Sequence, residues 1–98
     1  MHWLLFYDYV EDVAERRAPF REAHLGLVRD LAAAGVVLLA GALAEPLDGA
    51  VYLFAPADDA TAVEDFVARD PYVAQGLVTG WRIRPWTVVA GVERFTQA

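Results

Sequence analysis

The fold of this 98-residue chain is decided by residues 35–55, which read GVVLLAGALAEPLDGAVYLFA. Val36–Ala44 is nearly all apolar, and a run of this length directly after a helix stop predicts a well-buried strand. The Glu45–Gly49 cluster, with its proline and its Asp-Gly pair, marks a turn. Ala50–Ala55 is a second apolar run. The segment therefore predicts an antiparallel hairpin in the middle of the chain.

The segments on either side of this hairpin have the periodicity of helices and strands. Apolar residues recur every three or four positions from Pro19 to Ala34, where Pro19 suits the first turn of a helix and Gly35 suits its end. Glu11–Arg17 is polar and predicts a loop or an irregular turn. Pro85 inside the last strand favours an edge position or a bulge. We expect strands over Trp3–Val10 and Val78–Ala90, a second helix over Asp59–Arg69, and a short helix over Pro71–Gln75.

The expected elements follow the order strand, helix, strand, strand, helix, strand, in one domain over residues 1–98 with its core at about 3–90 and a short tail over 91–98. This order predicts an α+β fold of the ferredoxin-like βαββαβ type, with a four-stranded antiparallel sheet and both helices on one face. The other face is then bare. The chain is 57% hydrophobic, and large apolar patches are rare on monomers. We therefore expect a homodimer in which two bare faces stack.

The composition excludes several classes of function. The chain has a formal charge of −6 and no Lys, so it lacks the clustered cations that bind nucleic acid. It has no Cys, which excludes disulfides, thiolate nucleophiles and Cys-based zinc sites and fits a cytoplasmic protein. Its first residues do not resemble a signal peptide, and no apolar run approaches the ~20 residues that span a bilayer. We therefore expect no membrane contact. Because zinc-ligand spacing and a phosphate loop are missing as well, we also expect no metal and no cofactor.

His24 is the first candidate for chemistry. It shares a helical stripe with Phe20, Leu27 and Leu31, so its ring is expected to face the sheet. Histidine is the side chain that most readily moves protons near neutral pH. The alternative is a core histidine satisfied by a backbone carbonyl, since an unpaired buried polar group costs ~1–3 kcal/mol.

Three charged residues are candidates for completing a site around His24. Arg17 and Arg21 share its helix flank if helical order reaches back to Arg17, and they would then clamp an anion. Their alternative role is a solvated cationic face. Asp70, directly before Pro71, is placed to cap a short helix. It would also orient the histidine as in an Asp–His pair, and the two roles are compatible because one carboxylate has two oxygens.

Aromatic residues provide candidates for the wall of a pocket. Tyr7, Tyr72, Trp81 and Trp86 suit such a wall, since ligand pockets are rich in aromatic side chains. The alternative is that they belong to the core or to a subunit interface, where aromatic residues are also enriched.

Four segments combine into one pattern: Arg17-x-x-x-Arg21-x-x-His24-Leu25, Leu39-Ala40-Gly41, Asp70-Pro71-Tyr72-Val73-Ala74-x-Gly76-Leu77 and Arg84-Pro85-Trp86. In this order and spacing they resemble the YciI-like (YCII-related) family over about residues 3–90. The resemblance implies a ferredoxin-like fold that pairs into a dimeric α+β barrel. It also implies acid–base chemistry without a cofactor, including lyase-type elimination on small aromatic compounds.

The resemblance also assigns roles to individual residues. His24 and Asp70 take the positions of the family's proposed catalytic pair. The residues that we expect to bind a small, anionic or aromatic substrate are Arg17, Arg21, Tyr7, Gly41 and Tyr72. The short turn at Glu45–Gly49 is a departure from relatives with a longer loop, and it bears on the substrate more than on the fold.

Three hypotheses about function are compatible with the sequence. The first is a cofactor-independent enzyme in which His24 is the general acid or base and Asp70 orients it. The second is a small-molecule binder or accessory protein on the same scaffold, because a fold does not fix a function. The third is a purely structural oligomer, which requires these two side chains to lie apart.

Overall fold

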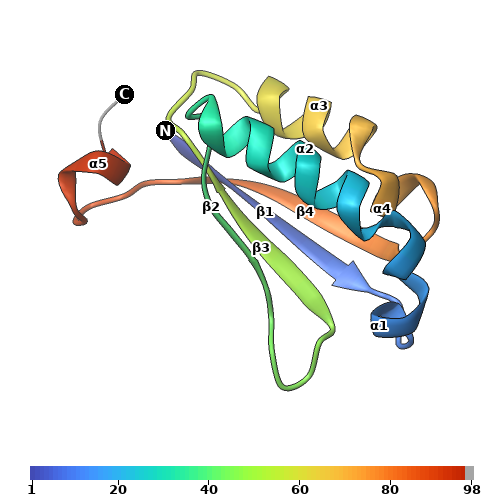
Figure 1. Cartoon of the computed structure of the whole chain (residues 1–98). Helices are drawn as coiled ribbons and strands as arrows, with labels where there is room; N and C mark the ends of the chain where they lie inside the picture. Colours follow the sequence, from blue (N-terminus) through green and yellow to red (C-terminus); the bar gives the residue numbers. More distant parts are fainter. Residues whose placement is uncertain (97–98) are drawn as a thin grey trace.

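The computed structural model describes residues 1–96 and has the expected α+β architecture. Its four antiparallel strands form one sheet in the order β2-β3-β1-β4. The strands are β1 (His2–Tyr9), β2 (Val37–Ala42), β3 (Gly49–Phe54) and β4 (Val78–Trp86). The two long helices, α2 (Arg21–Ala33) and α3 (Thr61–Arg69), lie on one face of this sheet (Figure 1). The ferredoxin-like order predicted from the sequence is thus confirmed.

Short helical segments account for the local differences from the predicted elements. The segment expected to be irregular, Glu11–Arg17, contains the helix α1 (Val13–Arg16), which is anchored by the buried Val13. Pro19 lies in a 3-10 turn, η1 (Ala18–Phe20), that precedes α2. Arg17 lies between α1 and this turn with helical dihedral angles, but α2 itself begins only at Arg21. Two further short helices are α4 (Pro71–Ala74) and α5 (Glu93–Thr96).

The prediction of a well-buried strand after the first helix is wrong for β2. Only Val37 at its start is buried, and the residues from Leu39 to Ala42 are exposed. The reason is its position at the edge of the sheet, which hydrophobicity alone does not distinguish from a central position. The other edge strand, β4, ends at Trp86 rather than Ala90, and it carries Pro85 at an edge position as expected.

The strand register divides the side chains between the two faces of the sheet. Trp3, Leu5 and Tyr7 of β1 point toward the helices, and the β3 residues paired with them share that face. The buried core between sheet and helices consists of Leu5, Tyr7, Val13, Val37, Ala50, Tyr52, Phe54, Val63, Phe66, Val67, Tyr72, Leu77 and Val78. Two polar side chains, those of His24 and Asp70, are buried beside this core.

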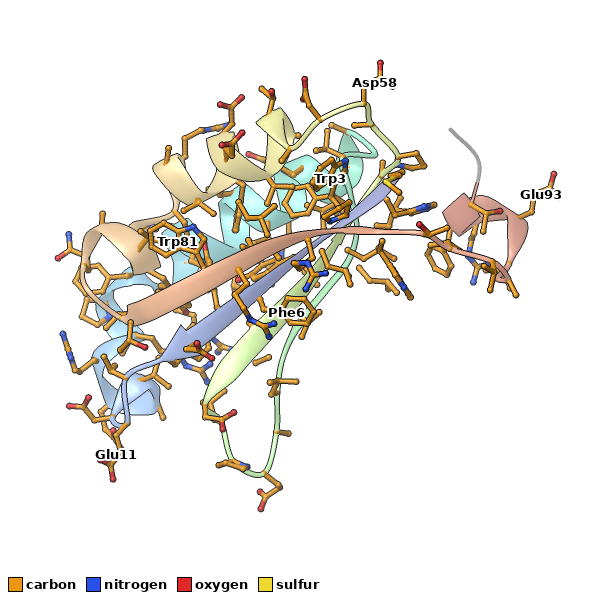
Figure 2. All side chains as sticks on the ribbon, turned by 180° about the vertical axis from the view of Figure 1, so that it is seen from behind. Trp3, Phe6, Glu11, Asp58, Trp81 and Glu93 are labelled. Carbon is orange, nitrogen blue, oxygen red and sulfur yellow. The ribbon has the colours of Figure 1, made fainter. Side chains whose placement is uncertain are left out.

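No helix in residues 1–96 covers the opposite face of the sheet, which we call the open face (Figure 1). Leu4 and Phe6 of β1 lie there beside Leu53 and Val51 of β3, and all four are partly exposed. Figure 2 labels Phe6. The Arg82 guanidinium lies over the Phe6 ring, 4.6 Å from its centroid. The open face therefore carries a patch of apolar side chains flanked by cations.

The C-terminal segment runs from β4 to α5, beside the start of β1 (Figure 1). The imidazole of His2, which is buried, contacts the carbonyl oxygen of Phe95 through Nε2. This contact ties the two ends of the described chain together. Within residues 1–96, no helix has the length and apolarity to cross a membrane.

Candidate active site

Asp70 lies at the junction of α3 and α4, and its carboxylate is 1% exposed. Pro71 cannot continue α3, so the chain turns and begins α4 with Asp70 as its N-cap. Oδ1 accepts a hydrogen bond from the backbone N–H of Tyr72 at 3.0 Å, and Oδ2 accepts one from the Tyr7 hydroxyl at 2.8 Å. The carboxylate is thus fixed from both sides, which leaves it pointing at α2.

His24 meets this carboxylate from α2. Its Nδ1 lies 2.7 Å from Asp70 Oδ1, and its side chain is 7% exposed. Because a carboxylate only accepts hydrogen bonds, Nδ1 carries the hydrogen, and the neutral ring then has its lone pair on Nε2. Nε2 is 3.5 Å from the Tyr52 hydroxyl oxygen. The contact with Asp70 therefore fixes both the tautomer and the direction of the free nitrogen.

Tyr72 holds the imidazole from its flat side. The two rings are stacked, with centroids 3.8 Å apart and 3° between their planes. Arg21 gives a hydrogen bond to the Tyr72 hydroxyl, and the charges of Arg21 and Arg17 act on this tyrosine. Burial nevertheless raises the pKa of Tyr72 above its ordinary value. Two cations thus lie at the outer end of a ring whose inner face is packed on the histidine.

Tyr7, Tyr9 and Tyr52 surround the Asp70–His24 contact with phenol groups. Burial raises the pKa of Tyr7 and of Tyr52 well above the ordinary range, and the nearby Asp70 charge raises both further. Burial also raises the pKa of Tyr9 to about 12, although a hydrogen bond from Tyr52 and the Arg17 charge act in the opposite direction. These hydroxyls therefore remain protonated and neutral across the physiological pH range.

A cavity of about 150 Å³ lies in front of His24 Nε2. Its polar wall consists of Tyr9, Arg17, Arg21, His24, Tyr52 and Tyr72. Its apolar wall consists of Leu25 and Val28 from α2, Ala40, Gly41 and Ala42 from β2, and Ala50 from β3. The cavity thus combines one imidazole, two guanidinium groups and three phenols around a small apolar space.

Most of the residues singled out in the sequence come together here. His24, Arg17, Arg21, Gly41 and Tyr72 line the cavity, and Asp70 lies directly behind His24. Tyr7 is not among the lining residues, because its hydroxyl is turned to Asp70. It supports the carboxylate rather than a ligand.

The two tryptophans lie elsewhere. Trp81 borders a second, apolar hollow between α3, α4 and β4 (Figure 2), and Trp86 pairs with His2 at the edge of the sheet. Glu64 is the one titratable side chain in that hollow, so it offers no acid–base pair. Within residues 1–96 no three His, Asp or Glu side chains gather into a group that would hold a metal ion.

Two of the polar lining residues, Tyr9 and Tyr52, were not identified from the sequence. Tyr9 is two residues beyond Tyr7 on the same strand, so the period of two could have placed it on the same face. Tyr52 lies in an apolar strand where an aromatic residue is expected in the core. Its position beside His24 depends on how α2 packs on the sheet, which no local pattern in the sequence contains.

Comparisons with known proteins agree with this fold and extend over nearly the whole chain. The structure is similar to that of the 5-chloro-2-hydroxyhydroquinone dehydrochlorinase from Burkholderia phenoliruptrix AC1100, solved in complex with 2,5-dihydroxybenzoquinone. The TM-score is 0.74 at 20% sequence identity, over 89% of this chain and 94% of that one. No curated protein matches the sequence. The model of the YCII-related domain matches residues 1–87, and the chain therefore belongs to the YCII-related domain family.

Proposed function

We propose that this protein is a cofactor-independent enzyme in which His24 is the general acid–base residue and Asp70 orients it. One observation carries the proposal: Nδ1 of the buried imidazole binds Asp70, while Nε2 faces a cavity. A base needs a free nitrogen within reach of a substrate proton, and its cation needs a partner. Asp70 would stabilise that cation as the carboxylate does in other Asp–His pairs.

The substrate class follows from the charges and the size of the cavity. Arg17 and Arg21 present guanidinium groups, which bind carboxylate or phenolate oxygens. The remaining wall is apolar or aromatic, and the volume is small. A small molecule with one ring, or of similar size, and at least one anionic oxygen fits this combination of groups.

The proposed reaction is a lyase-type elimination. His24 Nε2 takes a proton from a C–H or O–H bond of the substrate, and the electron pair of that bond moves into the substrate to form a new double bond. The leaving group departs as an anion with the electron pair of its own bond. The proton on Nε2 then passes to solvent, which restores the neutral ring. The dehydrochlorinase activity of the structural relative supports this reaction class.

A non-catalytic binder is the second candidate, because the two guanidinium groups and the apolar wall of the cavity suit a small anion whether or not a bond is broken. In that case, the same groups hold an anion, and no bond is broken. Product analysis separates the two candidates, since only the enzyme releases a new compound.

The test uses 5-chloro-2-hydroxyhydroquinone, with released chloride and the quinone product measured over time. We expect turnover in the wild type and a loss of ~10²–10⁴-fold in His24→Asn. Asparagine keeps an N–H for Asp70 but has no basic nitrogen, so the variant removes the base and spares the buried carboxylate. Equal chloride release by both proteins would exclude His24 as the base. Saturable binding without product would favour the binder.

We further propose that two copies pair through their open faces and that the protein works in the cytoplasm. Leu4, Phe6, Val51 and Leu53 form a partly exposed apolar patch of the kind that monomers seldom carry. Stacking two such faces would remove the patch from water and give the dimeric barrel that the family resemblance implies. The absence of Cys fits a reducing compartment.

A further inference from the structure

Two tyrosine hydroxyls near the cavity, those of Tyr52 and Tyr9, have no part in the proposed acid–base reaction. Tyr52 on β3 is 2% exposed, and its hydroxyl oxygen lies 3.5 Å from Nε2. Tyr9 on β1 lines the same cavity, and its hydroxyl accepts a hydrogen bond from Tyr52. A buried phenol next to a base is costly to keep unless it is hydrogen-bonded. The burial of the Tyr52 hydroxyl beside His24 therefore suggests a chemical role for this group.

The ring of Tyr52 is fixed by the core. It meets the Tyr7 ring edge to face, with centroids 5.1 Å apart and 68° between planes, and it packs on Phe66 at 5.0 Å. Both neighbours are themselves fully buried. The hydroxyl is thus held in one place before any ligand enters, which is the property of a preorganised hydrogen-bond donor.

At rest, Nε2 has only a weak hydrogen-bond partner, the Tyr52 hydroxyl. Tyr52 directs its hydrogen to Tyr9, and the separation of 3.5 Å from Nε2 is long for a hydrogen bond. A ligand oxygen placed between the two tyrosines and the imidazole would take over the hydrogen of Tyr52. The neutral phenol gives up no proton in that exchange, because burial keeps it protonated.

We propose that Tyr52 is a second catalytic residue of this site. It donates a hydrogen bond to the substrate oxygen that gains negative charge as His24 takes the proton. Tyr9 is the positioning residue that orients the Tyr52 hydroxyl. The inference rests on the proposed acid–base function. When Nε2 removes a proton from carbon, the C–H electron pair forms a C=C bond, and the carbonyl π pair moves onto oxygen. The oxyanion accepts a hydrogen bond from Tyr52, and the imidazolium faces Asp70.

This arrangement narrows the substrate class. One oxygen faces Arg17 and Arg21, and a second oxygen faces Tyr52 across the cavity. The reactive proton lies between them, within reach of Nε2. A small ring or chain that carries two separated oxygens, one of them a carbonyl, or a phenol in its keto tautomer, next to the reacting carbon, satisfies all three contacts. Phosphate esters, and amides that lack a removable proton next to the carbonyl, do not satisfy these contacts.

The experiment measures binding of 2,5-dihydroxybenzoquinone by its visible absorption band in wild type, Tyr52→Phe, Tyr9→Phe and His24→Asn. We expect the dissociation constant to rise by roughly ten- to a hundredfold in Tyr52→Phe, because a hydrogen bond to a charged oxygen is lost. The bound band should shift toward its position in water. In a turnover assay, kcat should fall by ~10²-fold or more with a smaller change in KM, since the donor acts mainly on the transition state.

The positioning role of Tyr9 has a separate readout in the ¹⁵N resonances of the imidazole. Without the Tyr9 oxygen, the Tyr52 hydrogen is free to turn to Nε2, and the Nε2 signal should move toward that of a hydrogen-bonded nitrogen. The Nδ1–H signal should persist in both tyrosine variants, which verifies that the Asp70 contact is intact. An Nε2 signal that does not move in Tyr9→Phe would refute this role.

Incorporation of 3-fluorotyrosine at position 52 provides a second test in case Tyr52→Phe does not fold, because the hydroxyl is retained. Fluorine makes the phenol a stronger donor without removing it, and we expect tighter binding of the quinone. One outcome would overturn the role of Tyr52 and leave the acid–base proposal standing. In that outcome, the affinity and the absorption band are unchanged in both position-52 proteins, and His24→Asn loses binding. If the wild type shows no saturable binding, or His24→Asn binds equally well, both proposals fail.

Discussion

The ring of Tyr72 lies flat on the imidazole of His24, with 3.8 Å between their centroids. The backbone N–H of the same residue binds the carboxylate that holds the edge of that imidazole. One short turn of chain therefore fixes the histidine in two directions, through stacking and through Asp70. Of the two ring nitrogens, only Nε2 keeps access to the cavity.

Replacement of Asp70 by Asn tests how the carboxylate sets the tautomer of His24. The amide offers one oxygen and one NH₂ group to three donors, so either Tyr7 must turn its hydroxyl or the imidazole must move its hydrogen to Nε2. We expect a loss of about 1–3 kcal/mol in the free energy of unfolding. The imidazole ¹⁵N spectrum distinguishes the two cases, because only the second moves the hydrogen from Nδ1 to Nε2. The matched control is Asp58→Asn at an exposed carboxylate, which should change stability by less than about 0.5 kcal/mol.

Substitutions of Tyr72 separate stacking from the bond to Arg21. Tyr72→Phe keeps the ring and should lower stability by about 1 kcal/mol or less. Tyr72→Leu removes the stacked pair, worth about 0.5–1.5 kcal/mol, and leaves a cavity beside the core that adds to this loss. Thermal unfolding measures both variants. If the leucine variant were as stable as the phenylalanine variant, the stacked geometry would have no energetic role.

The core of this site could be predicted from the sequence only in part. The apolar periodicity predicted that His24 faces the sheet, and the Asp-Pro pair predicted an N-cap at Asp70. Both are local patterns. The contact between these residues joins positions 46 apart. The residue types made Asp70 a candidate for orienting His24, and the family resemblance assigned the pair, but no local pattern brings the two side chains together. Tyr52 was missed because strand register and helix packing, both long-range, place it beside the imidazole.

The same limit explains the strand that was predicted to be buried. Val36–Ala44 is apolar in composition whether its strand lies in the centre or at the edge of a sheet. The sheet order places β2 at the edge, so most of its apolar residues face solvent in the single chain. The position of β4 was easier to predict, because Pro85 lacks the N–H that a central strand requires.

The four tyrosines predict a dependence of stability on alkaline pH. Burial raises the pKa of each above its ordinary value of 10, to about 12 for Tyr9. The folded state therefore binds more protons than the unfolded state between these values, and the free energy of unfolding falls as pH rises. The contribution of Tyr9 is fully present below pH 10 and is lost as pH rises through about 12.

Absorbance at 295 nm measures this effect directly. At a pH near 10, the unfolded chain should show about half of its tyrosines ionised, and the folded protein should show a smaller ionised fraction. Tyr9→Phe should remove the part of the titration that lies near pH 12. A folded protein whose tyrosines all titrate near 10 would show that the cavity is open to water.

The open face predicts the association state. Phe6 lies at the centre of its apolar patch, between Val51 on β3 and the guanidinium of Arg82 on β4. Phe6→Glu would place a charge in a stacked interface, whereas in a single chain the new carboxylate would pair with Arg82 and leave the fold intact. We expect light scattering to give twice the chain mass of 10.8 kDa for the wild type and the single mass for the variant. Ala68→Glu adds the same charge on the exposed side of α3 and should stay dimeric. A wild type of single mass at micromolar concentration would mean that this apolar face is stable in water without a second copy.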